Sequence, residues 1–152
     1  MARDMKLFRV VASSFLLLFS ILSMGASAET VIQCENPKGY SYYIEGIAVP
    51  KSESGWVQDE IDPGKFAFSI NDNNEADIIF IDATGNLNSA RSQGATIILV
   101  GSDEDLITVF VKFSEAAFEI YTFDLARRYA VFSQHKFESF VERAGTLYAD
   151  CL

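Results

Sequence analysis

The sequence predicts an all-β protein, an antiparallel meander of about eight strands in a closed or nearly closed barrel, with a two-sheet β-sandwich as the alternative. Three observations predict this fold class. β-branched and aromatic residues dominate the apolar runs of the chain. Short stretches rich in Gly, Asn, Asp and Ser separate these runs, as tight turns between neighbouring strands do. Two cysteines, Cys34 and Cys151, lie where they can join the first strand to the last.

The strands predicted first along the chain are the less regular ones. Residues 29–35 form a short strand that a turn over residues 36–39 ends, because Pro and Gly favour a turn there. Residues 40–48 form an aromatic strand. Residues 50–63 are predicted to be a polar loop, and this loop carries Trp56, the only tryptophan of the chain.

The next strand, residues 65–70, alternates cleanly. Phe66, Phe68 and Ile70 share one face, while small or polar residues share the other. This pattern is typical of an antiparallel strand with one buried face. The same apolar runs predict the later strands, at residues 77–82, 95–100, 106–113, 118–124, 129–134 and 145–151.

For two of these later segments the sequence leaves a choice, of the buried face in one and of helix or strand in the other. In residues 106–113, the better core face carries Ile107, Val109, Val111 and Phe113. Residues 115–143 contain good helix formers, so a helix is the competing interpretation there. The Tyr, Phe, Thr, Ile and Val side chains that crowd this segment favour a hairpin of two strands instead.

The first 28 residues are predicted to be a secretory signal peptide. Three basic residues precede an apolar run over residues 10–22, and a small-residue Ala-Ser-Ala site follows at residues 26–28. An uncleaved anchor is the alternative, but the run is shorter than the roughly 20 residues that a spanning helix needs. Cleavage before Glu29 would leave residues 29–152 as a single β-rich domain, periplasmic or secreted.

The charge of the chain limits its partners. The formal net charge is −9, and because the leader holds three basic residues and one acid, cleavage would bring it to −11. Such a surface repels phosphate backbones and anionic membranes, so neither nucleic acid nor a membrane is expected to bind the mature chain. A cationic extracytoplasmic protein or ligand is the favoured partner, although acidity also serves solubility alone.

The two cysteines predict a disulfide. Export would place Cys34 and Cys151 in an oxidising compartment, where an even pair usually bridges. Two free thiols are the alternative. A bridge between them would close nearly the whole mature chain into one loop.

Few residues suggest catalysis, and we expect no enzyme, no cofactor and no metal site. His135 is the only histidine, and no nucleophile motif or phosphate-binding Gly-rich loop accompanies it. Asp77 and Asp82 lie five residues apart on a predicted strand, so their side chains point to opposite faces. The oxygen-rich stretch at residues 72–77 lacks the Gly and Glu of a calcium loop and is better explained as a turn.

Aromatic and acidic residues in the irregular half are the candidate binding residues. Trp56 lies near two carboxylates in a polar loop, and tyrosines precede it. Such residues could contact a sugar or a protein partner. Trp56 could instead be a plug that closes one end of the barrel. The predicted ligand or partner contacts are Trp56, Tyr40, Tyr43, Asp59 and Glu60.

Several motifs give the chain a resemblance to known proteins. These are C-x-N-P-K-G-Y-x-Y-Y at residues 34–43, G-W-x-x-D-x-I at 55–61, D-I-x-F-x-D-A-T-G at 77–85, E-I-Y-T-F at 119–123 and a terminal A-D-C at 149–151. Together with the leader they resemble small exported, cysteine-bracketed bacterial proteins of unknown function. The resemblance implies export and one domain, and it implies no chemistry.

Two functions remain open at this level. The first is a binding or inhibitory module for another protein, for which periplasmic lysozyme inhibitors are an analogy. The alternative is a carrier of an apolar small molecule with lipocalin-like architecture, which needs an interior too large for side chains to fill. The chain holds 13 phenylalanines, three of them in the leader, and this number predicts a filled interior.

Overall fold

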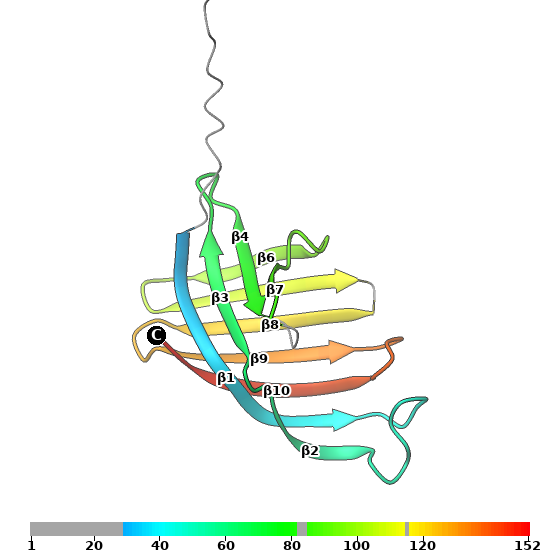
Figure 1. Ribbon diagram of the computed structural model, residues 1–152. Coiled ribbons are helices and arrows are strands. Elements are labelled where there is room, and N and C mark those ends of the chain that lie inside the picture. Colours follow the sequence, from blue (N-terminus) through cyan, green and yellow to red (C-terminus); the bar gives the residue numbers. More distant parts are fainter. Residues whose placement is uncertain (1–28, 82–84, 115) are drawn as a thin grey trace, which may run out of the picture.

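In the part of the chain that the structure describes, ten antiparallel strands form one hydrogen-bonded sheet that curls strongly into a half-barrel (Figure 1). The computed structural model describes residues 29–81, 85–114 and 116–152. The predicted signal peptide and Asp82 lie outside this range. The all-β, barrel-like prediction is confirmed, and the described residues contain no helix. They also form one continuous sheet, in place of the two that a sandwich would require.

The strands are numbered in the order in which they occur along the chain. Their bounds are β1 Glu29–Tyr43, β2 Gly55–Glu60, β3 Lys65–Ile70, β4 Ala76–Ile81, β5 Leu87–Ser89, β6 Thr96–Ser102, β7 Leu106–Ser114, β8 Ala117–Asp124, β9 Tyr129–Lys136 and β10 Arg143–Cys151.

Strand β1 differs from the sequence prediction, because it runs without a turn through Pro37. A β-bulge makes this possible. The pairing between β1 and β10 shifts register between Glu35 and Lys38, and Asn36 has a φ of 48°. Proline has no N–H to donate, so it is tolerated at a bulge where the ladder is interrupted. The turn expected at residues 36–39 is therefore a bend within one long strand.

The bend gives β1 different partners on one of its sides. Its first half pairs with β3 and its second half with β2, while β10 follows it on the other side. The predicted polar loop over residues 50–63 thus contains a strand, and Trp56 belongs to that strand. The loop prediction was wrong because β2 is rich in Gln, Asp and Glu and pairs only with β1, so apolar runs do not mark it.

The same bend folds the sheet over itself. Along its hydrogen bonds the strand order is β5-β4-β3-β1-β10-β9-β8-β7-β6, and β3 and β4 run steeply across β7–β9 in Figure 1. Aromatic rings of β3 and β4 contact rings of β7 and β8. The ring centroids of Phe68 and Phe123 are 5.8 Å apart, and those of Phe80 and Phe113 are 6.2 Å apart. The core therefore lies on the concave side of the curled sheet.

Core faces follow the predicted alternation in the later strands. Ile107, Val109 and Val111 of β7 are buried, as expected, and Phe113 is partly buried against the same core. The segment for which a helix competed forms the β8–β9 hairpin instead. The inward faces of this hairpin carry Tyr121, Phe123 and Phe132. Tyr121 and Phe123 are two residues apart, and a strand places such residues on the same face.

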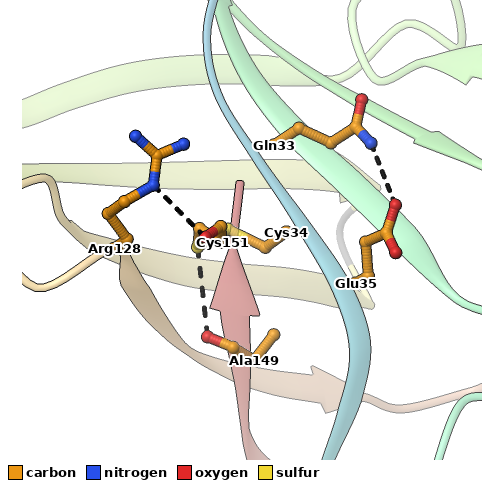
Figure 2. Close-up of a disulfide and its surroundings, with 6 residues drawn as sticks. All are labelled: Gln33, Cys34, Glu35, Arg128, Ala149 and Cys151. Carbon is orange, nitrogen blue, oxygen red and sulfur yellow. Dashed lines mark hydrogen bonds between the residues drawn. A yellow bond between two sulfur atoms is a disulfide. The ribbon is translucent and has the colours of Figure 1, made fainter.

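The predicted disulfide is confirmed (Figure 2). Cys34 and Cys151 are directly paired residues of β1 and β10, with their Cα atoms 3.9 Å apart, and both side chains are buried. The Nε of Arg128 donates to the carbonyl oxygen of Cys151 at 3.4 Å. The bridge joins the first strand to the last, as expected, but neither of them is an edge of the sheet. The hydrogen-bonded path ends at β5 and β6, whereas β1 and β10 are neighbours within it.

Candidate functional site

A cavity of about 400 Å³ opens at one end of the half-barrel. Its lining includes the ends of β7 and β9 and the beginnings of β8 and β10. These strand ends lie on the right-hand side of Figure 1. The turn after β2 and the first residues of β3 form part of its rim. Buried phenylalanines fill much of the concave side, as expected, but they leave this end open. Its lining residues are Pro37, Ile61, Gly64, Lys65, Phe66, Phe80, Ile81, Gln93, Phe113, Ala117, Glu119, Tyr121, Phe132, Gln134, Lys136 and Arg143.

Aromatic rings make up one wall of the cavity. The ring of Phe132 lies 5.3 Å from that of Phe66 and 5.2 Å from that of Tyr121. Phe66 and Tyr121 are in turn 5.6 Å apart. Because these three rings come from β3, β8 and β9, their positions depend on β3 crossing the concave face. The rings offer a preformed apolar surface, which is the usual lining of a small-molecule site.

Polar side chains from β8, β9 and β10 line the cavity beside these rings. Glu119 and Gln134 are directly paired across β8 and β9, and both are buried. The hydroxyl of Tyr121 donates to the carboxylate of Glu119. An Nη atom of Arg143 donates to Oε1 of Gln134 at 3.2 Å. Lys136 is less tightly engaged, since its Nζ lies 3.9 Å from Oε1 of Glu119.

Burial and the neighbouring carboxylate determine the state of Tyr121. Loss of solvent raises the pKa of Tyr121 well above its ordinary value, and the charge of Glu119 raises this pKa further. The phenol therefore stays protonated at any physiological pH. It remains available as a hydrogen-bond donor to Glu119, which keeps the buried carboxylate partnered.

Gln134 has one group that remains without a partner. The residue is only 1% exposed, and its Oε1 is bonded to Arg143, but no hydrogen-bond partner of Nε2 exists among the described residues. A buried donor without a partner costs about 1–3 kcal/mol. A cavity wall with such a group is suited to a bound acceptor atom.

Two of the residues singled out from the sequence belong to the network that holds Arg143. Oδ2 of Asp59 accepts from Ser41 Oγ at 2.7 Å, from Tyr43 Oη at 3.1 Å and from Arg143 Nη1 at 3.0 Å. Arg143 Nη1 also donates to Tyr43 Oη at 2.9 Å. Neither Tyr43 nor Asp59 lines the cavity. Their role in this structure is to hold the arginine that does.

The other predicted contacts lie on the outer, convex face of β1 and β2. Trp56 is 72% exposed and Tyr40 is 61% exposed, and Glu60 is also exposed. The rings of Trp56 and Tyr42 pack in a T-shaped arrangement, with their centroids 5.6 Å apart. Of the five predicted residues, Tyr40, Trp56 and Glu60 therefore lie on the outer face, whereas Tyr43 and Asp59 belong to the inner polar network. Trp56, Tyr40 and Tyr42 form an outer aromatic group. Trp56 is also no plug of the barrel.

Sequence reasoning missed the polar residues of the cavity. A signal was nevertheless present in the alternation of β8 and β9. Glu119 shares its face with Tyr121 and Phe123, and Gln134 shares its face with Phe132. A polar residue that continues an apolar face toward a strand end indicates either an exposed barrel rim or a polar cavity wall. Only the folding over of β3 and β4 distinguishes these two cases.

Comparison of the chain with family models, with curated proteins and with solved structures finds no match. Within the described ranges, no group of three or more His, Cys, Asp or Glu side chains is arranged to hold a metal ion. Over the same residues, no helix has the length and apolar character needed to cross a membrane.

Proposed function

We propose that this protein binds a small apolar molecule in the aromatic-lined cavity. The observation that carries this proposal is the open space of about 400 Å³ beside the rings of Phe66, Tyr121 and Phe132. Small-molecule sites are typically apolar concavities of about 300–1,000 Å³ with a few placed polar groups. A β-sheet that is rigidly paired on both sides of the cavity would keep such a site preformed.

A neutral fluorescent dye tests this proposal. N-phenyl-1-naphthylamine is apolar and brightens when it leaves water, so its titration reports a dry binding site. Ala117 lines the cavity at the start of β8, and Ala117→Phe should fill part of the space and weaken dye binding by roughly tenfold. Thr96→Phe adds a similar ring at an exposed position of β6 outside the cavity and should leave binding unchanged. Equal binding to both variants, or none to the unmodified protein, would refute the proposal.

The outer aromatic group supports a second candidate, a binding or inhibitory module for another protein. Exposed Trp and Tyr side chains are the residues that most often anchor a protein interface, and Trp56, Tyr42 and Tyr40 lie together on β1 and β2. The acidic chain favours a cationic partner. A basic lysozyme is a suitable probe for a pull-down. Capture that weakens with added salt and with Trp56→Ala would support this candidate, and no capture at low salt would count against it.

Both candidates place the protein outside the cytoplasm, after removal of the predicted signal peptide. The Cys34–Cys151 disulfide supports this location, because disulfides persist in oxidising compartments. Expression in a bacterium that secretes into an oxidising periplasm, followed by mass spectrometry of the recovered protein, tests it. A chain that begins at Glu29 is the expected result. An uncleaved chain in the cytoplasmic fraction would contradict the proposed export.

A further inference from the structure

The polar wall of the cavity contains donors that have no close partner. One carboxylate oxygen of Glu119 accepts from Tyr121, the other faces Lys136, and Oε1 of Gln134 accepts from Arg143. The donor Nε2 of Gln134 has no partner among the described residues. The Nζ of Lys136, at 3.9 Å from Glu119, is beyond hydrogen-bonding distance of it. Both donors would be satisfied by a ligand that supplies acceptor atoms.

The charged residues of the lining also favour an acceptor that is negative. Among the described residues, three cationic side chains line the cavity against one carboxylate, that of Glu119, in a chain whose formal net charge is −9. Two of these cations have a close carboxylate partner outside the lining. Lys65 Nζ lies 2.6 Å from Glu35, and Arg143 Nη1 lies 3.0 Å from Asp59. Lys136 is the lining cation whose ion pair is the most open.

We infer that the cavity takes an amphipathic carboxylate, with the apolar body of the ligand against the aromatic rings and the anionic head beside Lys136 and Gln134. This inference rests on the proposed small-molecule function and specifies its ligand class. A carboxylate has two oxygens, and it therefore has acceptors enough for the ammonium of Lys136 and for Nε2 of Gln134. The head would thereby satisfy the donor that the protein alone leaves unpaired.

Lys136 is suited to select this ligand because of its place in the fold. It is the last residue of β9 and pairs with Ala117 of β8 and Arg143 of β10, so it lies at the cavity mouth. Its side chain is 36% exposed, whereas that of Glu119 is 10% exposed. An incoming head group therefore meets the ammonium before it meets the buried carboxylate. The apolar body can then reach the rings below.

Two ligands of equal chain length test the inference. Decanoate and decanol share an apolar body and differ in the charge of the head, and each can compete with the bound neutral dye. On the unmodified protein, in mildly alkaline buffer, decanoate should displace the dye at a concentration roughly tenfold lower than decanol. Equal potency of the two would overturn the inferred head-group site while leaving the apolar cavity intact. Failure of the dye itself to bind would instead overturn the proposed function.

Variants at the head-group site give the second test. Lys136→Met should remove most of the advantage of decanoate and leave decanol unchanged. Lys112→Met deletes the same charge from an exposed position of β7 outside the cavity, and it should change neither ligand. Gln134→Glu keeps an acceptor for Arg143 but replaces the free donor by a negative oxygen, so it should weaken decanoate alone. Retention of the full decanoate advantage in both site variants, with native near-ultraviolet circular dichroism, would refute the inference.

Discussion

Removal of the disulfide should destabilise the protein through its unfolded state. Cys34 and Cys151 are 117 residues apart, so the bridge closes almost the whole described chain into one loop. In the chain-entropy model a loop of this length corresponds to about 4.9 kcal/mol at about 25 °C. Residual structure in the unfolded chain reduces this value. We expect a loss of about 3–5 kcal/mol in the free energy of unfolding.

Three forms of the protein separate the covalent link from the packing of the sulfur atoms. These are the oxidised protein, the same protein reduced in denaturant and refolded under reductant, and the Cys34→Ala/Cys151→Ala variant. The reduced protein keeps both sulfur atoms in the core, whereas the alanine variant removes them. If loop closure is the cause, both unlinked forms lose stability by a similar amount.

Urea unfolding followed by far-ultraviolet circular dichroism is the appropriate assay. The fluorescence of Trp56 is a poor probe, because this side chain is already 72% exposed in the folded protein. The unlinked forms should also show a steeper dependence on urea, because an unlinked chain exposes more surface when it unfolds. A loss below about 1.5 kcal/mol in the reduced protein would refute the loop-closure reasoning. Loss in the alanine variant alone would assign the effect to core packing.

Three further predictions concern single side chains. Arg143→Met removes the cationic partner of the mostly buried Asp59 carboxylate, so it should lower the free energy of unfolding in urea by about 3–5 kcal/mol. Adding Asp59→Leu should restore at least part of this loss. A double variant no more stable than the single one would contradict this prediction. The pKa of Tyr121 is raised in the fold by burial and by Glu119, so its contribution is complete below the pKa of an unfolded tyrosine and is lost as pH rises above it. The urea midpoint of the unmodified protein should therefore fall more steeply in alkali than that of Tyr121→Phe, and parallel curves would count against the raised pKa. Trp56→Ala should change stability by less than about 0.5 kcal/mol, since the side chain is exposed, and a thermal melt that shows a larger loss would mean that Trp56 packs against the fold.

Local patterning was sufficient to predict the strands whose side chains alternate cleanly. The period of two in β7, β8 and β9 identifies their buried faces, because one-sided burial imposes that period on the sequence. For β3 the prediction of one buried face was wrong, since Ala67 and Ser69 are buried as well as Phe66 and Phe68. The pairing of Cys34 with Cys151 was equally predictable, since only two cysteines occur. Strand β2 was missed because its side chains are mostly exposed. A strand without a buried face shows no alternation of apolar and polar residues.

The candidate site was not predictable to the same degree. Asp59 and Tyr43 were found as polar and aromatic residues of interest, but their partner Arg143 is 84 positions from Asp59 and 100 from Tyr43. No local pattern joins residues that far apart. The cavity itself is formed by residues of seven different strands and of the turns after β2 and β5, and sequence spacing does not determine which of them meet.

The sequence by itself determined the fold class, the disulfide and the inward faces of the regular strands, because these depend on alternation and on residue type. The bulge at residues 36–37, the passage of β3 and β4 across the concave face, and the open cavity were decided by the tertiary structure. Their physical reason is long-range packing. One bend in β1 directs two strands over the rings of β8 and β9, and Glu119, Gln134 and Lys136 then lie beside a space that side chains leave open.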